Sequence, residues 1–165
     1  MANIVEIKGD LFMCPSHFTL AHTISVDLKM SRGIARTFKE KYGQVSFLRT
    51  QILSVGNCAS LIDDNGRRVF YLATKNRFFH KPSLQSVHAA LLSLKNHMLL
   101  LNLSFLAMPR VGSGLDKLHW PTVKRIISDV FSDTPHITIH IFYLQWLVLP
   151  ECSPYFPSKE KAFTL

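Results

Sequence analysis

The sequence predicts an α/β fold in which one mixed sheet carries helices on both of its faces. Short β-rich runs alternate with segments of helical periodicity along the 165 residues, and two neighbouring runs are separated by a hairpin-type turn. The composition, 47% apolar and 18% charged, supports a packed core and excludes a disordered tail or a collagen-like repeat. The length fits one domain.

Six apolar or β-branched runs predict strands, at residues 4–7, 18–25, 57–62, 67–74, 105–108 and 137–142. The third and fourth runs are joined by Asp63-Asp64-Asn65-Gly66, which contains the Asn-Gly pair that tight hairpins prefer. Pro109 ends the fifth run, and the sixth alternates between apolar and polar residues.

Three segments have the spacing of helices, at residues 33–42, 83–101 and 121–131. In the first, Ile34 and Phe38 share a face and Gly43 is suited to the end of the helix. The second has apolar residues every three or four positions and begins after the candidate N-cap Ser83. The third carries Pro121 in its first turn.

We expect residues 1–144 to form the folded domain and residues 145–165 to be an irregular C-terminal extension. Residues 150–165 contain three prolines and the polar run Ser158-Lys159-Glu160-Lys161, and they lack helical or strand periodicity. Neither an internal repeat nor a low-complexity segment is found.

The charge balance favours an anionic partner. Lysine and arginine number 19 and aspartate and glutamate 11, which gives a net charge of +8. Such a balance suits a phosphate, a nucleotide, a nucleic acid or an acidic membrane, and composition alone does not choose among them.

Cysteine usage and the hydrophobic runs indicate an intracellular protein, in the nucleus or the cytoplasm. The cysteines, Cys14, Cys58 and Cys152, are odd in number, widely spaced and without a CxxC pair, so we expect free thiols. The first residues lack the pattern of a signal peptide. The most apolar stretches, residues 98–107 and 137–149, are shorter than the roughly 20 residues that cross a bilayer.

Ligands of such sheets bind beyond the carboxyl ends of the strands, which directs attention to the loops at 8–12, 25–33, 74–82 and 109–119. The loop Pro109-Arg110-Val111-Gly112-Ser113-Gly114-Leu115-Asp116 has glycines that allow close backbone approach to a phosphate. An ordinary strand-to-helix turn stays open as an explanation. The third glycine of a dinucleotide fingerprint is missing, and the sequence is not a P-loop.

Two further segments are candidates for ligand contact. The loop at residues 25–35 leads into a helix that begins at Gly33, and the start of a helix attracts anions. Arg32, Arg36 and Lys39 share one face of this helix, where they either bind an anion or are simply solvated. Lys75 stands at the end of an apolar strand, and two interpretations stay open for it: a nucleophile or an ordinary surface lysine.

The eight histidines do not indicate a metal site. No HExxH motif is present, and His136 and His140 lie about 13 Å apart if their segment is a strand. The sequence also lacks the G-x-S-x-G elbow of α/β-hydrolases. We therefore expect neither a metal nor a cofactor.

Taken together, these loops resemble a macrodomain of the terminal ADP-ribose protein glycohydrolase branch. The matching stretches keep the order and near-family spacing of that branch over residues 3–144. They are Val5-Glu6-Ile7-Lys8-Gly9-Asp10-Leu11-Phe12, Leu20-Ala21-His22-Thr23-Ile24-Ser25, Gly33-Ile34-Ala35, Tyr71-Leu72-Ala73-Thr74-Lys75, His80-Lys81-Pro82, residues 108–116 and Leu118-His119-Trp120. The resemblance implies a three-layer α/β/α fold that binds ADP-ribose.

The resemblance also implies the roles of individual residues. Lys75 and Asp116 fall on the family's catalytic lysine and aspartate. Asp10 would accept from the adenine amino group, Phe142 would pack on adenine, and the loops at 33–35 and 109–115 would enclose the diphosphate and distal ribose. The full set of implied ADP-ribose contacts is Asp10, Leu11, His22, Ser25, Gly33, Ile34, Ala35, Thr74, Pro109, Arg110, Val111, Gly112, Ser113, Gly114, Leu115, Phe142 and Leu144.

The implied function is hydrolysis of ADP-ribose esters. A lysine amine attacking the anomeric carbon of the distal ribose, with an aspartate moving protons, suits removal of mono-ADP-ribose from glutamate or aspartate and deacylation of O-acyl-ADP-ribose. The expected partners are ADP-ribose and mono-ADP-ribosylated proteins, with the protein acting as a monomer. The alternatives are a non-catalytic reader of ADP-ribose or poly-ADP-ribose, and a phosphatase acting on ADP-ribose 1″-phosphate.

The sequence departs from this branch at two places. Ser31-Arg32 stands where relatives carry smaller residues. These two side chains either hinder the approach of the backbone to the diphosphate, or Arg32 forms an ion pair with the diphosphate. The chain also continues after Leu144, where relatives end near adenine. The Asn-Asn-Ala-Asn loop of other macrodomains is missing, which argues against their branch.

Overall fold

The structure is a computed structural model that describes residues 1–51 and 54–144. Its centre is a six-stranded sheet of order β1-β6-β5-β2-β4-β3, in which only β3 and β4 pair antiparallel. The strands are β1 (Asn3–Lys8), β2 (Thr19–Ser25), β3 (Cys58–Ile62), β4 (Arg68–Lys75), β5 (Phe105–Pro109) and β6 (Thr138–Tyr143). The predicted mixed sheet is confirmed.

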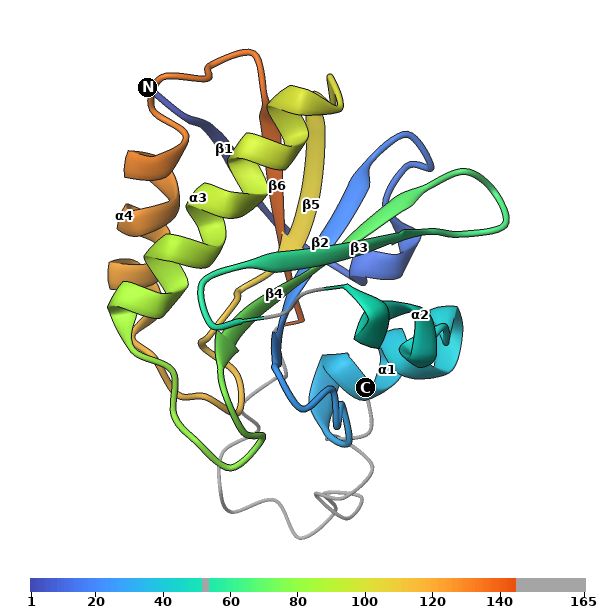
Figure 1. The fold of residues 1–165 in the computed structure, drawn as a ribbon. Coiled ribbons are helices and arrows are strands. Elements are labelled where there is room, and N and C mark those ends of the chain that lie inside the picture. The colour runs from blue at the N-terminus through green and yellow to red at the C-terminus, as the bar shows by residue number, and fades with distance from the viewer. Residues whose placement is uncertain (52–53, 145–165) are drawn as a thin grey trace, which may run out of the picture.

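The helices lie on both faces of the sheet, as predicted, and give three layers (Figure 1). They are the 3₁₀ turn η1 (Leu11–Met13) and the helices α1 (Gly33–Tyr42), α2 (Val45–Thr50), α3 (Leu84–Leu100) and α4 (Trp120–Val130). Helices α3 and α4 cover one face, and α1 and α2 lie on the other. Every element predicted from the sequence is present within two residues of its expected ends.

Side-chain alternation along the strands produces a core on each face. In β4, Phe70 and Leu72 pack with α3 and α4, whereas Val69 and Tyr71 pack with α1 and α2. All four are fully buried, which explains why the run reads as continuously apolar. The two cores hold the strands in register, and so they fix where each strand ends.

The hairpin between β3 and β4 is closed by an aspartate. Asp63 Oδ1 accepts from the N–H groups of Asn65 and Arg67 at 2.9 and 2.8 Å, and the Asp63 N–H donates to the Arg67 carbonyl. Gly66 takes a positive φ of 85°. The turn therefore depends on the Asp63 side chain as well as on the Asn-Gly pair.

Two short elements were not predicted. Helix α2 has only six residues and follows Gln44 in the left-handed conformation, so no amphipathic period reveals it. Turn η1 is held by Asp10, whose side chain accepts from the Phe12 N–H at 2.9 Å. An aspartate directly before the apolar residues Leu11 and Phe12 was the available signal for η1.

Three sequence expectations concern the rest of the chain. Cys14 and Cys58 are free thiols, and Cys152 and the predicted extension at 145–165 lie outside the described residues. Within residues 1–51 and 54–144, no helix has both the length and the apolar character that crossing a bilayer requires.

Candidate active site

Three parallel strands bring the candidate residues to one edge of the sheet. Strands β2, β4 and β5 are parallel neighbours, so their carboxyl ends, at Ser25, Lys75 and Pro109, lie at the same edge. The loops that follow them contain most of the residues predicted to contact a ligand. The topology thus gathers segments that are up to 84 residues apart, from Ser25 to Pro109.

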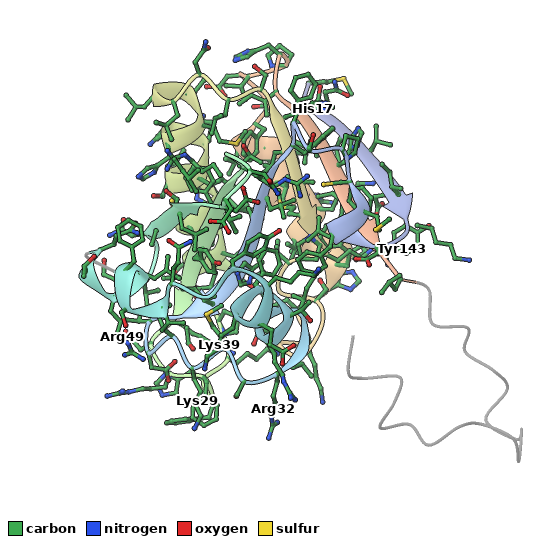
Figure 2. The ribbon with its side chains drawn as sticks, turned by 90° about the vertical axis from the view of Figure 1, so that its right-hand side faces the viewer. His17, Lys29, Arg32, Lys39, Arg49 and Tyr143 are labelled. Atoms are coloured by element: carbon green, nitrogen blue, oxygen red, sulfur yellow. The ribbon has the colours of Figure 1, made fainter. Side chains whose placement is uncertain are left out.

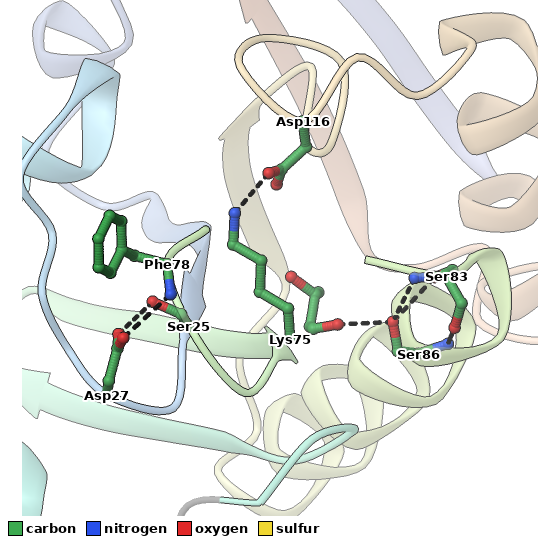
Figure 3. Close-up of polar contacts among 8 residues, drawn as sticks. Ser25, Asp27, Lys75, Phe78, Ser83, Ser86 and Asp116 are labelled. Atoms are coloured by element: carbon green, nitrogen blue, oxygen red, sulfur yellow. Dashed lines mark hydrogen bonds and ion pairs between the residues drawn. The ribbon is translucent and has the colours of Figure 1, made fainter. Parts of the chain in front are cut away.

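Lys75 and Asp116 meet at this edge. Lys75 Nζ lies 2.6 Å from Asp116 Oδ1, although the residues are 41 positions apart (Figure 3). Their side chains are 14% and 16% exposed, so the pair is largely shielded yet reachable from solvent. The predicted convergence of an amine and a carboxylate is therefore present.

The end of β4 is fixed from both sides. The Lys75 carbonyl accepts from the Val26 N–H at 2.9 Å, and the Thr74 carbonyl accepts from Ser86 Oγ at 2.6 Å, at the start of α3. Ser86 also shares a capping box with Ser83. Since both neighbouring segments hold the backbone, the Lys75 side chain starts from a well-defined position.

Asp27 connects two loops beside Lys75. Its carboxylate accepts from the Ser25 hydroxyl and from the Phe78 N–H at 2.9 Å (Figure 3). It also accepts from the Lys29 N–H at 3.2 Å. Burial by itself raises the pKa of Asp27, but these hydrogen bonds outweigh burial and lower the pKa overall. A charged Asp27 thus holds the segment after β4 against the segment after β2.

The glycine-containing loop folds back so that Asp116 faces β4. Gly112 has φ 74°, and a Cβ at this position would lie 2.9 Å from Leu118 Cδ1. The Leu118 N–H donates to the Gly112 carbonyl at 2.8 Å, which closes the loop around Asp116. A glycine is needed here for both its conformation and its size.

The two loops expected to enclose a diphosphate approach each other. A Cβ on Gly33 would lie 3.2 Å from Leu115 Cδ1, so the start of α1 and the glycine-containing loop are in near contact. Gly33 also has φ 57°. Arg32 precedes Gly33, and its side chain is exposed and makes no hydrogen bond to the start of α1.

Comparison with known proteins identifies the family. No protein-family model matches the chain. The bovine ADP-ribose glycohydrolase OARD1 is 43% identical over 140 residues, covering 84% of this chain and 91% of that protein, and the human protein is 44% identical over 133 residues, covering 81% and 87%. The macrodomain of Mycobacterium tuberculosis DarG superposes with a TM-score of 0.78 at 22% identity, covering 86% of this chain and 98% of the other.

The chain belongs to the macrodomain family, in the branch of the ADP-ribose glycohydrolase OARD1. The family and the three-layer fold that the sequence resemblance implied are thereby confirmed.

The residues predicted to contact adenine lie at the same edge of the macrodomain sheet, but at the end formed by β1 and β6 rather than at the end formed by β4. Asp10 is exposed after β1, and Leu11 and Phe142 are nearly buried members of one core cluster. Leu144 is 47% exposed beyond the end of β6. These four gather at β1 and β6, away from Lys75, and their contacts with a ligand stay predictions.

His22 lies inside the macrodomain core. Its ring stacks on Phe38 with centroids 3.8 Å apart and meets the edge of Tyr71 at 4.7 Å. Full burial lowers the pKa of His22 to about 3, so the ring is neutral at physiological pH. The ring supports α1 from beneath, and its predicted contact with a ligand stays a prediction.

The remaining predicted residues lie in the loops around the pair. Ile34 and Ala35 pack partly into the core beneath α1, and Val111 is buried in the core of the other face. The hydroxyls of Thr74 and Ser113 are buried without a hydrogen-bond partner in the described part of the chain. Buried hydroxyls of this kind favour partners supplied by a ligand or by water.

A cluster around Glu6 was missed by the sequence reasoning. Glu6 accepts from Arg110 Nε at 3.1 Å, from Trp120 Nε1 at 2.9 Å and from Lys124 Nζ at 2.8 Å. The Arg110 guanidinium also lies 4.1 Å from the Tyr143 ring centroid. The base of the glycine-containing loop is therefore tied to β1, β6 and α4, and Arg110 is directed to this cluster.

No group of three or more histidine, cysteine, aspartate or glutamate side chains suited to a metal ion occurs in the described ranges 1–51 and 54–144.

Proposed function

We propose that this macrodomain hydrolyses esters of ADP-ribose, releasing ADP-ribose from modified glutamate and aspartate side chains and deacylating O-acyl-ADP-ribose. The observation that carries the proposal is the 2.6 Å contact between Lys75 Nζ and Asp116 Oδ1. The relatives named ADP-ribose glycohydrolase OARD1 support the substrate class.

The proposed reaction proceeds in two displacements. Paired with Asp116, Lys75 is an ammonium without a lone pair, so Asp116 first takes one of its protons. The amine then forms a C–N bond to the anomeric carbon of the distal ribose while the C–O bond to the carboxylate breaks, and the carboxylate leaves with the bonding electrons.

Water completes the cycle. The protonated Asp116 gives its proton to the departing carboxylate and so becomes a carboxylate again, which then accepts a proton from the attacking water. The water oxygen bonds to the anomeric carbon while the C–N bond of the ammonium adduct breaks, with its electrons going to nitrogen. ADP-ribose is released, and Asp116 returns the proton to the free Lys75 amine. The N–H groups of the loop around Gly112 would hold the diphosphate throughout.

The proposal is tested with a peptide carrying ADP-ribose on one glutamate. Lys75→Ala is expected to lower kcat by at least about 10³-fold, since the covalent route is removed, while calorimetry finds ADP-ribose bound nearly as tightly as in the wild type. Equal release of ADP-ribose by both proteins would exclude the lysine mechanism. Retained binding with no turnover in the wild type would favour the reader of ADP-ribose or poly-ADP-ribose.

A further inference from the structure

An exposed basic and aromatic surface borders the candidate active site. It consists of Lys29, Lys39, Arg77, Phe78 and Phe79, here called the basic aromatic rim. Phe78 and Phe79 are 40% and 70% exposed, and their ring centroids lie 5.3 Å apart at an interplanar angle of 87°. Lys29 Nζ lies 4.3 Å from the centre of the Phe78 ring, and Lys39 Nζ donates to the Lys29 carbonyl at 3.3 Å.

The rim is held in place by hydrogen bonds that lie next to those that fix Lys75. The Phe78 N–H donates to Asp27, which also binds Ser25, the partner of Lys75 in the β2–β4 register (Figure 3). The His80 N–H donates to the Arg77 carbonyl at 3.0 Å, so the segment is a closed turn. Two phenylalanines are thus presented to solvent on a fixed backbone, which indicates a contact surface.

The positive charge of the rim is only partly offset within the described chain, by Asp27, which attracts Arg77. Lys29, Lys39 and Arg77 are exposed and form no ion pair among residues 1–51 and 54–144. The nearby Asp27 carboxylate is already engaged by three hydrogen bonds. In Figure 2, Lys29 and Arg32 lie at the lower margin of the molecule and Lys39 lies just above them. The rim therefore presents a positive field beside two apolar rings.

The direction of a bound ligand places the rim on the side of the leaving group. The adenine contacts are expected at β1 and β6, whereas Lys75 ends β4, three strands from β6 and about 14 Å away at ordinary strand spacing. With adenine at one end and the reacting ribose at Lys75, whatever is attached to that ribose continues past β4. Phe78 and its neighbours follow Lys75 directly.

We infer that the basic aromatic rim binds the polypeptide that carries the modified residue and selects segments rich in carboxylates with an apolar side chain near the modified glutamate. This inference rests on the proposed function, in which the leaving group is a side-chain carboxylate of a polypeptide. Lys29, Lys39 and Arg77 complement flanking carboxylates, and Phe78 and Phe79 cover an apolar neighbour. Single-stranded nucleic acid is the competing occupant of such a surface.

The test compares three peptides that carry ADP-ribose on one central glutamate. Their flanks are acidic with one phenylalanine, neutral with the same phenylalanine, and basic. The wild type is expected to prefer the acidic peptide over the neutral one in kcat/KM, through KM, by about fivefold at low salt, as exposed charge pairs allow. Lys29→Ala should remove most of this preference, and Phe79→Ser should raise KM for both phenylalanine-containing peptides.

Matched controls separate the rim from general effects. Arg125→Ala removes an exposed cation from α4, and Leu100→Ser removes an 84% exposed apolar side chain from the end of α3. Both are expected to keep the wild-type preference, and all four variants should bind free ADP-ribose as the wild type does.

Three results would overturn the inference. The first is equal turnover of the three peptides by the wild type, and the second is an equal loss of the preference for the acidic peptide in Lys29→Ala and Arg125→Ala. The third is inhibition by a single-stranded oligonucleotide that exceeds inhibition by the unmodified acidic peptide and disappears in Phe79→Ser. Failure of the proposed function looks different, because no peptide would then release ADP-ribose. In that case the affinities of the three peptides, measured by fluorescence anisotropy, still test the rim.

Discussion

At the scale of single residues, Glu6 shows how one carboxylate fixes a loop that contains a catalytic candidate. Its hydrogen bond from Lys124, together with those from Trp120 and Arg110, outweighs the effect of burial and lowers the pKa of Glu6 below its ordinary value of 4.5. A lowered pKa means that the folded protein favours the charged form, so this group stabilises the fold above its ordinary pKa and loses that effect as the pH falls through the lowered value.

Replacement of Glu6 should therefore have a pH-dependent cost. Glu6→Gln is expected to lower the free energy of unfolding by about 2 kcal/mol at pH 7, since charge-assisted hydrogen bonds are lost. Below the lowered pKa the difference should shrink. Urea unfolding of both proteins at pH 7 and pH 3 measures it.

Glu40→Gln is the matched control for Glu6. Among the residues that the structure describes, Glu40 pairs only with Arg36, at 3.0 Å, and both side chains are more than 60% exposed. This change should cost less than about 0.5 kcal/mol at pH 7. Equal costs for the two glutamine variants would show that the Glu6 cluster does not stabilise the fold beyond an ordinary surface pair.

At the scale of elements, the parts that the sequence predicted are those governed by local rules. The apolar period of α3, the N-cap Ser83 and the aspartate-containing hairpin turn each act within a few residues, and the structure confirms each of them. The six residues of α2 have no such period, because one and a half turns cannot define an apolar face. Its position is set by packing of Leu48 into the core beneath α1.

The glycine-containing loop gives a prediction at this scale. Gly112→Ala places a side chain at φ 74° and 2.9 Å from Leu118 Cδ1, so it is expected to cost about 1–2 kcal/mol and to displace Asp116. The rate of ester hydrolysis should fall at least about tenfold, because a catalytic group displaced by about 1 Å can cost about 10²-fold in rate. Urea unfolding and ADP-ribose release measure the two effects.

Gly66→Ala separates these two effects. Gly66 has a similar φ of 85°, but a Cβ there meets nothing within 4 Å, and the residue lies in the β3–β4 hairpin. We expect a comparable loss of stability with unchanged activity. If Gly66→Ala reduced hydrolysis as strongly as Gly112→Ala, loss of activity would reflect instability rather than the position of Asp116.

At the scale of the whole molecule, the candidate site depends on topology that no local pattern reveals. The sequence singled out Lys75 at a strand end and Asp116 in a glycine-containing loop, but it paired them only through the resemblance to macrodomains, because each residue is ordinary by itself. The parallel pairing of β2 with β4 and β5 is what brings their loops together. The Glu6 cluster and the rim escaped prediction because they join residues from separate loops and faces.

The distribution of charge belongs to the same scale. The net charge of +8 predicted an anionic partner but no location. In the structure, Arg36 is paired with Glu40 and Lys124 with Glu6, whereas Lys29 and Lys39 stay exposed beside the site. The excess positive charge is thus available where the carrier of ADP-ribose would pass.

The central claim is that Lys75 and Asp116 act on the same sugar, and intact-mass spectrometry tests it most directly. The wild type and Asp116→Ala, which should form the adduct more slowly because Lys75 loses its base, are each incubated with a peptide carrying ADP-ribose on glutamate and quenched at intervals. We predict a protein species heavier by one ADP-ribosyl group, mapped to Lys75 by fragmentation and missing from Lys75→Arg. Full hydrolysis by Lys75→Arg, with no adduct in any variant, would contradict the account.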